Sequence, residues 1–171
     1  MNLQPFAEME SSTKVMVIVQ RKTGELVVSF VISGGLDSLE IPVDTGTSAR
    51  VDRLWENTCF ECFIAPADRS EYWEVNFSPA ADWNFYSFDE YRQGMREEAS
   101  IDHLAVQFGG VGDVLTVSAT IPLPSSIADS HIEVGLCAVV KEKTGNIGYW
   151  ALAHPAEQPD FHDRRSFVVT L

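Results

Sequence analysis

Short runs of alternating apolar and polar residues, separated by turn-forming residues, are the feature that most restricts the fold of this chain. A two-residue period sends successive side chains to opposite faces of a strand, and no run sustains the longer period of a helix. The breaks at 22–24, 33–35, 109–112 and 143–146 are typical of turns between strands. We expect strands over residues 14–20, 26–33, 39–43, 58–65, 72–78, 83–88, 104–108, 114–121, 132–140, 148–152 and 167–171.

About ten strands at this spacing are typical of a sandwich or a barrel, and we expect an all-β, antiparallel β-sandwich. The chain has 171 residues, of which 45% are hydrophobic, which fits one domain over residues 1–171 with a sizeable core. Two segments interrupt the pattern. Residues 89–99 are a helix candidate, and residues 124–129 are expected to form a turn.

The charge of the chain restricts its partners. A formal net charge of −13 gives a negative surface field, which repels phosphate backbones and anionic membrane surfaces. We therefore expect neither nucleic acid nor a membrane as a partner. Neutral and cationic ligands remain open, and the residues identify no cofactor and no oligomeric state.

The cellular location is expected to be cytoplasmic. Residues 1–12 contain neither a basic cluster nor an apolar run, so they do not resemble a secretory signal. No stretch approaches the roughly 20 apolar residues of a membrane span. Three cysteines do not resemble a secreted disulfide scaffold, and reduced thiols are expected.

The expected hairpin over residues 58–78 is the most informative segment. Alternation gives each strand one apolar face and one polar face with aromatics, and the polar faces carry Glu61, Glu74 and Asn76. If the turn is centred between Ala67 and Asp68, Glu61 lies directly opposite Glu74. Opposed carboxylates need a cation, a shared proton or a ligand between them, and would mark a site. If the turn centre lies a residue or two away, the two glutamates are diagonal neighbours on a solvated face.

Two other motifs resemble metal sites. Cys59 and Cys62 have the Cys-x-x-Cys spacing, but strand alternation separates their sulfurs, so we expect them neither to bind zinc nor to form a disulfide. The segment with His154, Asp160, His162 and Asp163 could supply metal ligands, although its spacing matches no specific metal motif. The alternative is a loop held by histidine hydrogen bonds.

Aromatic residues crowd the region 55–91 and return at 149–150. Aromatic faces stack on sugar rings and on cations, so tryptophan and tyrosine beside Glu and Asn would form a carbohydrate or ammonium platform. The alternative is a core position, which we expect for Trp73, Phe77 and Phe85. Either position remains open for Trp83, Tyr86 and Trp150.

Several ordered motifs between residues 55 and 167 resemble the bacterial DOMON-like proteins related to family 9 carbohydrate-binding modules. The resemblance is carried by Leu54-Trp55, Thr58-Cys-Phe-Glu61, Glu74-x-Asn76-Phe-Ser-Pro79, Trp83, Tyr86-x-Phe-Asp89, Tyr91-Arg92-x-Gly-Met95, Tyr149-Trp-Ala-Leu152, His154-Pro155 and Pro159-Asp-Phe-His162. It implies a β-sandwich whose concave sheet face holds a sugar or haem. It also implies that tryptophans stack on the sugar while acidic and amide groups bind its hydroxyls.

We therefore expect a non-catalytic module that binds a saccharide or a sugar-containing metabolite on a polar and aromatic sheet face. The expected ligand-binding residues are Glu61, Glu74, Asn76, Trp83, Tyr86, Arg92, Trp150 and His154, with no catalytic and no metal-binding residue. One alternative is a glycoside hydrolase in which Glu61 and Glu74 act as general acid and nucleophile. Another is a haem-binding DOMON domain with Met95 and a histidine as axial ligands.

Overall fold

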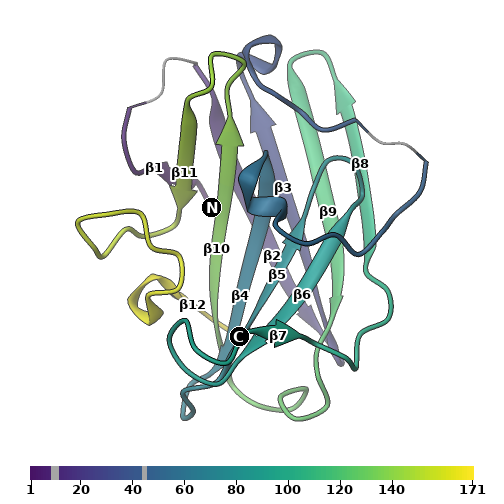
Figure 1. The fold of residues 1–171 in the computed structure, drawn as a ribbon, viewed down its shortest axis with the longest axis vertical. Coiled ribbons are helices and arrows are strands. Elements are labelled where there is room, and N and C mark those ends of the chain that lie inside the picture. The colour runs from purple at the N-terminus through teal and green to yellow at the C-terminus, as the bar shows by residue number, and fades with distance from the viewer. Residues whose placement is uncertain (9–11, 44–45) are drawn as a thin grey trace.

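The computed structural model describes residues 1–8, 12–43 and 46–171, and shows two antiparallel sheets packed face to face (Figure 1). The larger sheet has the order β1 (Gln4–Pro5), β11 (Ile147–Ala151), β10 (Ile132–Lys141), β4 (Cys59–Pro66), β5 (Tyr72–Phe77), β6 (Trp83–Phe88) and β7 (Arg96–Glu97). The short strand β12 (Val169–Thr170) also pairs with β10. The smaller sheet has the order β2 (Lys14–Lys22), β3 (Glu25–Ser33), β9 (Val114–Pro122) and β8 (Ala105–Val111).

The expected all-β antiparallel sandwich is confirmed. Helical structure among the described residues is limited to three single 3₁₀ turns, η1 (Leu36–Ser38), η2 (Leu54–Glu56) and η3 (Arg164–Ser166). None of these is long and apolar enough to cross a membrane.

The core between the sheets follows from strand alternation. In β3 every second residue is buried, which turns Phe30 toward the larger sheet. The Phe30 ring packs on Phe60 of β4 and Phe77 of β5, with ring centroids 4.9 and 5.8 Å apart. Burying one such side chain stabilises the fold by roughly 1.5–3 kcal/mol, so these facing rows hold the sheets together.

The larger sheet is buried on its outer face as well. All residues of β4, β5 and β6 are buried because loops cover the outer face. The covering loops include η2, the β6–β7 turn (residues 89–95) and the C-terminal loop (residues 152–166). A second apolar cluster lies beneath them, formed by Phe63, Ala65, Tyr72, Tyr86, Phe88, Cys137, Val139, Ala151, Phe161 and Phe167.

The expected helix over residues 89–99 is wrong. Two residues of the β6–β7 turn, Arg92 and Gly94, have φ angles of 54° and 68°, which a right-handed helix cannot contain. A Cβ at Gly94 would overlap the Asp89 carboxyl group, so only glycine fits at this position. The chain instead turns back into β7, which pairs with β6.

Other expected boundaries also shift. In the segment 39–43 only Leu39 makes an isolated bridge, to Glu142, and its side chain packs into the core. Gly109 and Gly110 lie within β8, so the turn there is confined to the residues around Gly112. The final strand is only two residues long. The expected turn at 124–129 is confirmed by the Ile127 amide, which donates to the Pro124 carbonyl at 2.9 Å.

Candidate functional site

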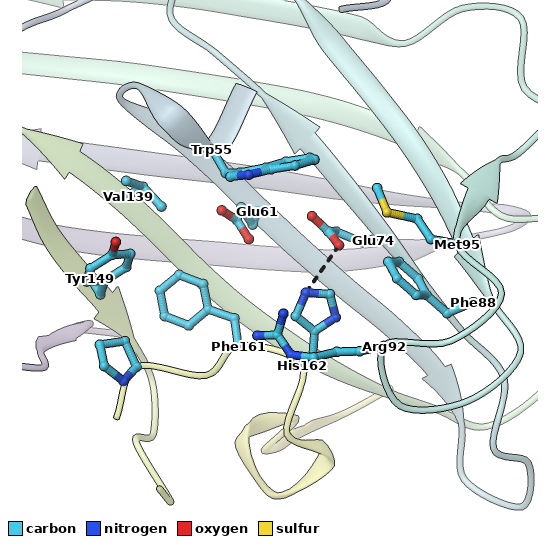
Figure 2. A pocket seen from close by; sticks show the side chains of 11 residues that line it. Trp55, Glu61, Glu74, Phe88, Arg92, Met95, Val139, Tyr149, Phe161 and His162 are labelled. Carbon is cyan, nitrogen blue, oxygen red and sulfur yellow. Dashed lines mark ion pairs between the residues drawn. The ribbon is translucent and has the colours of Figure 1, made fainter. Parts of the chain in front are cut away.

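A pocket of about 320 Å³ lies on the outer face of the larger sheet (Figure 2). Its floor comes from β4, β5 and β10, and its walls come from η2, the β6–β7 turn, β11 and the C-terminal loop. This volume is at the lower end of the range for small-molecule sites. The lining residues are Trp55, Glu61, Glu74, Phe88, Arg92, Met95, Val139, Tyr149, Pro159, Phe161 and His162.

The register of the central hairpin decides how the two glutamates meet. Glu61 pairs with Asn76, and Glu74 pairs with Phe63, so of the two registers left open by the sequence the one with Glu61 directly opposite Glu74 is wrong. They are diagonal neighbours on one face, as in the alternative register. That face is not solvated, because both side chains are only 3% exposed beneath the covering loops.

Hydrogen bonding is incomplete around this pair. The Asn76 amide group donates from Nδ2 to Oε1 of Glu74 at 2.8 Å. Within the part of the chain that the structure describes, Oε1 of Glu61 and Oδ1 of Asn76 are buried and accept no hydrogen bond. Because a buried polar atom normally has a partner, these acceptors require a proton or a donor from outside the chain.

Burial shifts the proton affinity of both carboxyl groups. Burial, and then the negative charge of Glu74, raises the pKa of Glu61 well above its ordinary value. Burial also raises the pKa of Glu74 to about 7, against the hydrogen bond from Asn76 and the charge of Arg92. Both shifts favour the protonated form of these carboxyl groups, and a pKa of about 7 leaves Glu74 poised to gain or lose a proton at neutral pH.

His162 presents a hydrogen-bond donor to the pocket. The Tyr72 hydroxyl lies 2.8 Å from Nδ1 of His162 and accepts from the backbone amide of Arg92 at 3.1 Å. Its single proton is therefore available for Nδ1, which assigns the ring hydrogen of neutral His162 to Nε2. Burial, and then Arg92, lowers the pKa of His162 to about 4. Nε2 is 3.7 Å from Oε2 of Glu74, and at neutral pH this contact is not an ion pair because the imidazole is uncharged.

The pocket wall is held by Asp160, which joins two loops. Its carboxylate accepts from Nη2 of Arg92 at 2.8 Å and from the Tyr91 hydroxyl at 2.6 Å, both in the β6–β7 turn. It also accepts from the backbone amide of His162 at 3.1 Å. The C-terminal loop, which carries Phe161 and His162, is thereby fastened over the sheet.

The structure brings together three of the expected ligand-binding residues, Glu61, Glu74 and Arg92. Asn76 lies behind Glu74 and positions it. Tyr86 does not line the pocket. Its hydroxyl donates to Asp52 at 2.6 Å, and its ring packs edge-to-face with that of Trp55, with ring centroids 5.8 Å apart. Tyr86 therefore supports the wall that Trp55 forms.

The other expected site residues lie elsewhere. Trp83 and Trp150 are only 3% and 4% exposed and belong to the core between the sheets, because alternation along β6 and β11 turns them inward. Neither ring has a free face for a ligand, which corrects the expected stacking role. His154 ties the C-terminal loop to β1, with Nε2 2.8 Å from the Gln4 carbonyl oxygen, and does not line the pocket.

The aromatic walls consist of residues outside the expected set. Trp55, Tyr149 and Phe161 surround the glutamates (Figure 2). Tyr149 could have been found from the sequence, because once Trp150 faces the core its neighbour must face the outer side of the sheet. Trp55 and Phe161 come from irregular segments, where no periodicity indicates a direction.

The cysteine motif is structural, whereas the histidine segment both holds a loop and contributes His162 to the pocket. Cys62 lies in the core and Cys59 faces the opposite side of β4, and all three cysteines are buried and free. Among the described residues no group of three or more His, Cys, Asp and Glu side chains could hold a metal ion. Hydrogen bonds at His154 and His162 do hold the C-terminal loop, as the second interpretation of that segment expected.

The haem alternative fits the pocket poorly. Met95 and His162 both line it, which supplies two axial ligand types. Nε2 of His162, however, faces the Glu74 carboxyl group at 3.7 Å, in space that an iron-bound macrocycle would have to occupy. We derive no chemistry through haem.

No family model and no curated protein matches this chain. Among solved structures, one from Bacteroides uniformis described as a "putative carbohydrate-binding protein" is similar, with a TM-score of 0.68 and 14% identity over 96% of this chain and 83% of that one. The β-sandwich fold that the sequence resemblance implies is therefore confirmed.

Two family 9 carbohydrate-binding module structures from Caldicellulosiruptor kristjanssonii were also found, each at 13% identity. One, in complex with glucose, has a TM-score of 0.46 over 85% of this chain and 69% of that one. The other, with cellotriose, has a TM-score of 0.49 over 88% and 69%.

Proposed function

We propose that this chain is a saccharide-binding module and that its ligand occupies the pocket on the larger sheet. The observation that carries the proposal is Oε1 of Glu61, a buried acceptor without a partner among the described residues at the floor of an aromatic-walled pocket. A ligand bound in the pocket can supply the hydrogen-bond donor that this oxygen lacks.

The chemistry of the walls suits a sugar ring. Trp55, Tyr149 and Phe161 offer apolar faces on which the C–H face of a ring can pack. Sugar hydroxyls both donate and accept, so they can donate to Glu61 and Glu74 and accept from Nε2 of His162. Together these groups can contact both the C–H face and the hydroxyl groups of one saccharide unit. The similar structure from Bacteroides uniformis, which is described as carbohydrate-binding, supports the same proposal.

Isothermal titration calorimetry with glucose, glucosamine and cello-oligosaccharides tests the proposal. We expect binding by the native protein and a loss of about tenfold or more in affinity for Glu61→Gln, because the amide NH₂ group of glutamine can only donate, whereas either oxygen of the carboxyl group can accept from a sugar hydroxyl. The control is Asp129→Asn, which makes the same carboxyl-to-amide change at an exposed position outside the pocket. Absence of binding to every saccharide, or unchanged affinity in Glu61→Gln, would contradict the proposal.

One observation favours a second candidate, glycoside hydrolysis. Burial raises the pKa of Glu61 well above its ordinary value and that of Glu74 to about 7, so one carboxyl group can be protonated while the other is ionised, as an acid and nucleophile pair requires. Aryl glycosides test this candidate directly. We expect no turnover above the buffer rate. Turnover that is lost in both Glu61→Gln and Glu74→Gln would replace the binding proposal with the enzymatic one.

A further inference from the structure

The two buried glutamates of the pocket have no cation beside them. Among the described residues, Glu61 forms no ion pair, and the only basic group within 4 Å of Glu74 is His162, which is uncharged at neutral pH. Burying an ionised carboxylate without a partner is unfavourable, so the empty pocket favours the protonated form of both groups. A cation that enters the pocket would remove that cost.

Arg92 does not supply this cation. Its side chain lines the pocket, but its guanidinium is 2.8 Å from Asp160 and the side chain is half exposed. The charge of Arg92 lowers the pKa of both glutamates, but the effect of burial is larger and raises both. Ionised Glu61 and Glu74 would therefore make the floor of the pocket negative, within a molecule of net charge −13.

The unpartnered atoms specify a donor. Oε1 of Glu61 is a buried acceptor at the floor of the pocket and has no donor within the described chain. A protonated amine carries three donors and no acceptor, so it can donate to Oε1 of Glu61 and to the Glu74 carboxyl group without bringing an acceptor of its own. The ring of Trp55 lines the same pocket (Figure 2), where its face can also attract a cation.

We propose that the ligand of this pocket is an amino sugar with a free primary ammonium group, seated between Glu61 and Glu74. This inference rests on the proposed function and names the class of saccharide. The hydroxylated ring of the ligand would pack against Trp55 and Tyr149, while its nitrogen would replace the protons that the glutamates hold in the empty protein.

This arrangement has a thermodynamic signature. When the ammonium group binds, Glu61 and Glu74 ionise, and the protons that they release pass to the buffer. A neutral sugar leaves both carboxyl groups protonated and releases none. Calorimetric titrations in two buffers of different ionisation enthalpy count the protons released for each ligand.

Three matched ligands test the proposal near pH 6.5, where the amine is protonated: glucosamine, glucose and N-acetylglucosamine. We expect glucosamine to bind about tenfold or more tightly than either neutral sugar and to release about one proton or more. In Glu61→Gln the affinity for glucosamine should fall by about tenfold more than the affinity for glucose, so that the preference for the amino sugar is lost. Asp129→Asn should retain the preference of the native protein.

The outcomes separate this inference from the proposed function. If glucose and N-acetylglucosamine bind as tightly as glucosamine, the chain binds saccharides and the ammonium inference is wrong. Ethanolamine, a simple amine without a ring, is the second control. If it binds as tightly as glucosamine and glucose does not bind, the pocket recognises amines and the saccharide proposal is wrong. If none of the four binds, both are contradicted.

Discussion

Glu74 and His162 are 3.7 Å apart, and burial shifts their pKa values toward each other's ordinary range. Burial raises the pKa of Glu74 to about 7, so its contribution to stability is present below pH about 4.5 and is lost as the pH rises through 7. Burial lowers the pKa of His162 to about 4, so stability is lost as the pH falls from about 6.5 through 4. Between pH about 4.5 and 6.5 the contributions of Glu74 and His162 to stability change in opposite directions with pH. Replacing one of the two residues separates the contributions.

Replacing Glu74 by Gln isolates the carboxyl contribution. We expect native protein and variant to have similar stability near pH 5, and the variant to be more stable near pH 8 by up to about 3 kcal/mol, which is the rise in the pKa of Glu74 from 4.5 to about 7 expressed as free energy. Urea unfolding at both pH values measures the difference. A variant that is clearly less stable at pH 8 would show that ionised Glu74 belongs to a stabilising network.

Two tryptophans are expected to respond in opposite ways. Trp83 lies in the core and the Arg50 guanidinium lies 4.4 Å from its ring centroid, so Trp83→Ala should destabilise the fold by about 3–5 kcal/mol. Trp55 is half-buried at the pocket, so Trp55→Ala should cost the fold much less and should lower saccharide affinity by about tenfold. Urea unfolding and calorimetry measure the two effects. Unchanged affinity in Trp55→Ala would remove Trp55 from the site.

At the scale of elements, the pocket depends on a loop that Asp160 fastens. Asp160→Asn weakens the contacts with Arg92 and Tyr91 at the protein surface, where such interactions contribute about 1 kcal/mol or less to stability. We expect a small change in unfolding free energy. Ligand affinity should fall several-fold, because Phe161 and His162 lose their fixed position. Equal affinity in the variant and the native protein would show that the loop keeps its position without Asp160.

The strands and their faces were predictable, because alternation records which side of a sheet is buried. The outward position of Glu61, Glu74 and Asn76 and the core position of Phe77 follow from that pattern alone. The register of the hairpin does not follow from this pattern. Shifting the turn centre by one residue keeps every side chain on the same face and changes only which residues are paired. Direct opposition of the glutamates therefore depended on a turn geometry that the sequence does not specify.

The walls of the site were less predictable than its floor. Trp55 is placed by a 3₁₀ turn and by contact with Tyr86, which lies in a strand 31 residues further along the chain. Phe161 is placed by a loop held through Tyr91 and Arg92. These are long-range contacts between irregular segments, and no local pattern encodes them. Trp83 and Trp150 are expected to bind the ligand because of their residue type. Their position is determined instead by the face of the strand on which each side chain lies.

At the scale of the whole molecule, the net charge of −13 should affect the kinetics of a cationic ligand. A negative field raises the association rate of an ammonium-bearing sugar and is screened by salt within about 10 Å at 0.1 M. We expect the glucosamine association rate to fall several-fold between low and high ionic strength, with glucose unaffected. Stopped-flow fluorescence measures both rates. A salt effect of equal size on glucose would show that the field does not act on the ligand charge.

The place of binding can be read from the indole N–H signals of the four tryptophans in a two-dimensional ¹H–¹⁵N NMR spectrum, assigned with single Trp→Phe variants. The four rings report on different places, because Trp55 lines the pocket while Trp73, Trp83 and Trp150 pack in the core between the sheets. On titration with glucosamine we predict that the Trp55 signal shifts with saturation while the other three stay nearly unchanged. A saturable shift at Trp83 or Trp150 with a silent Trp55 would contradict a saccharide site on the Glu61 and Glu74 face.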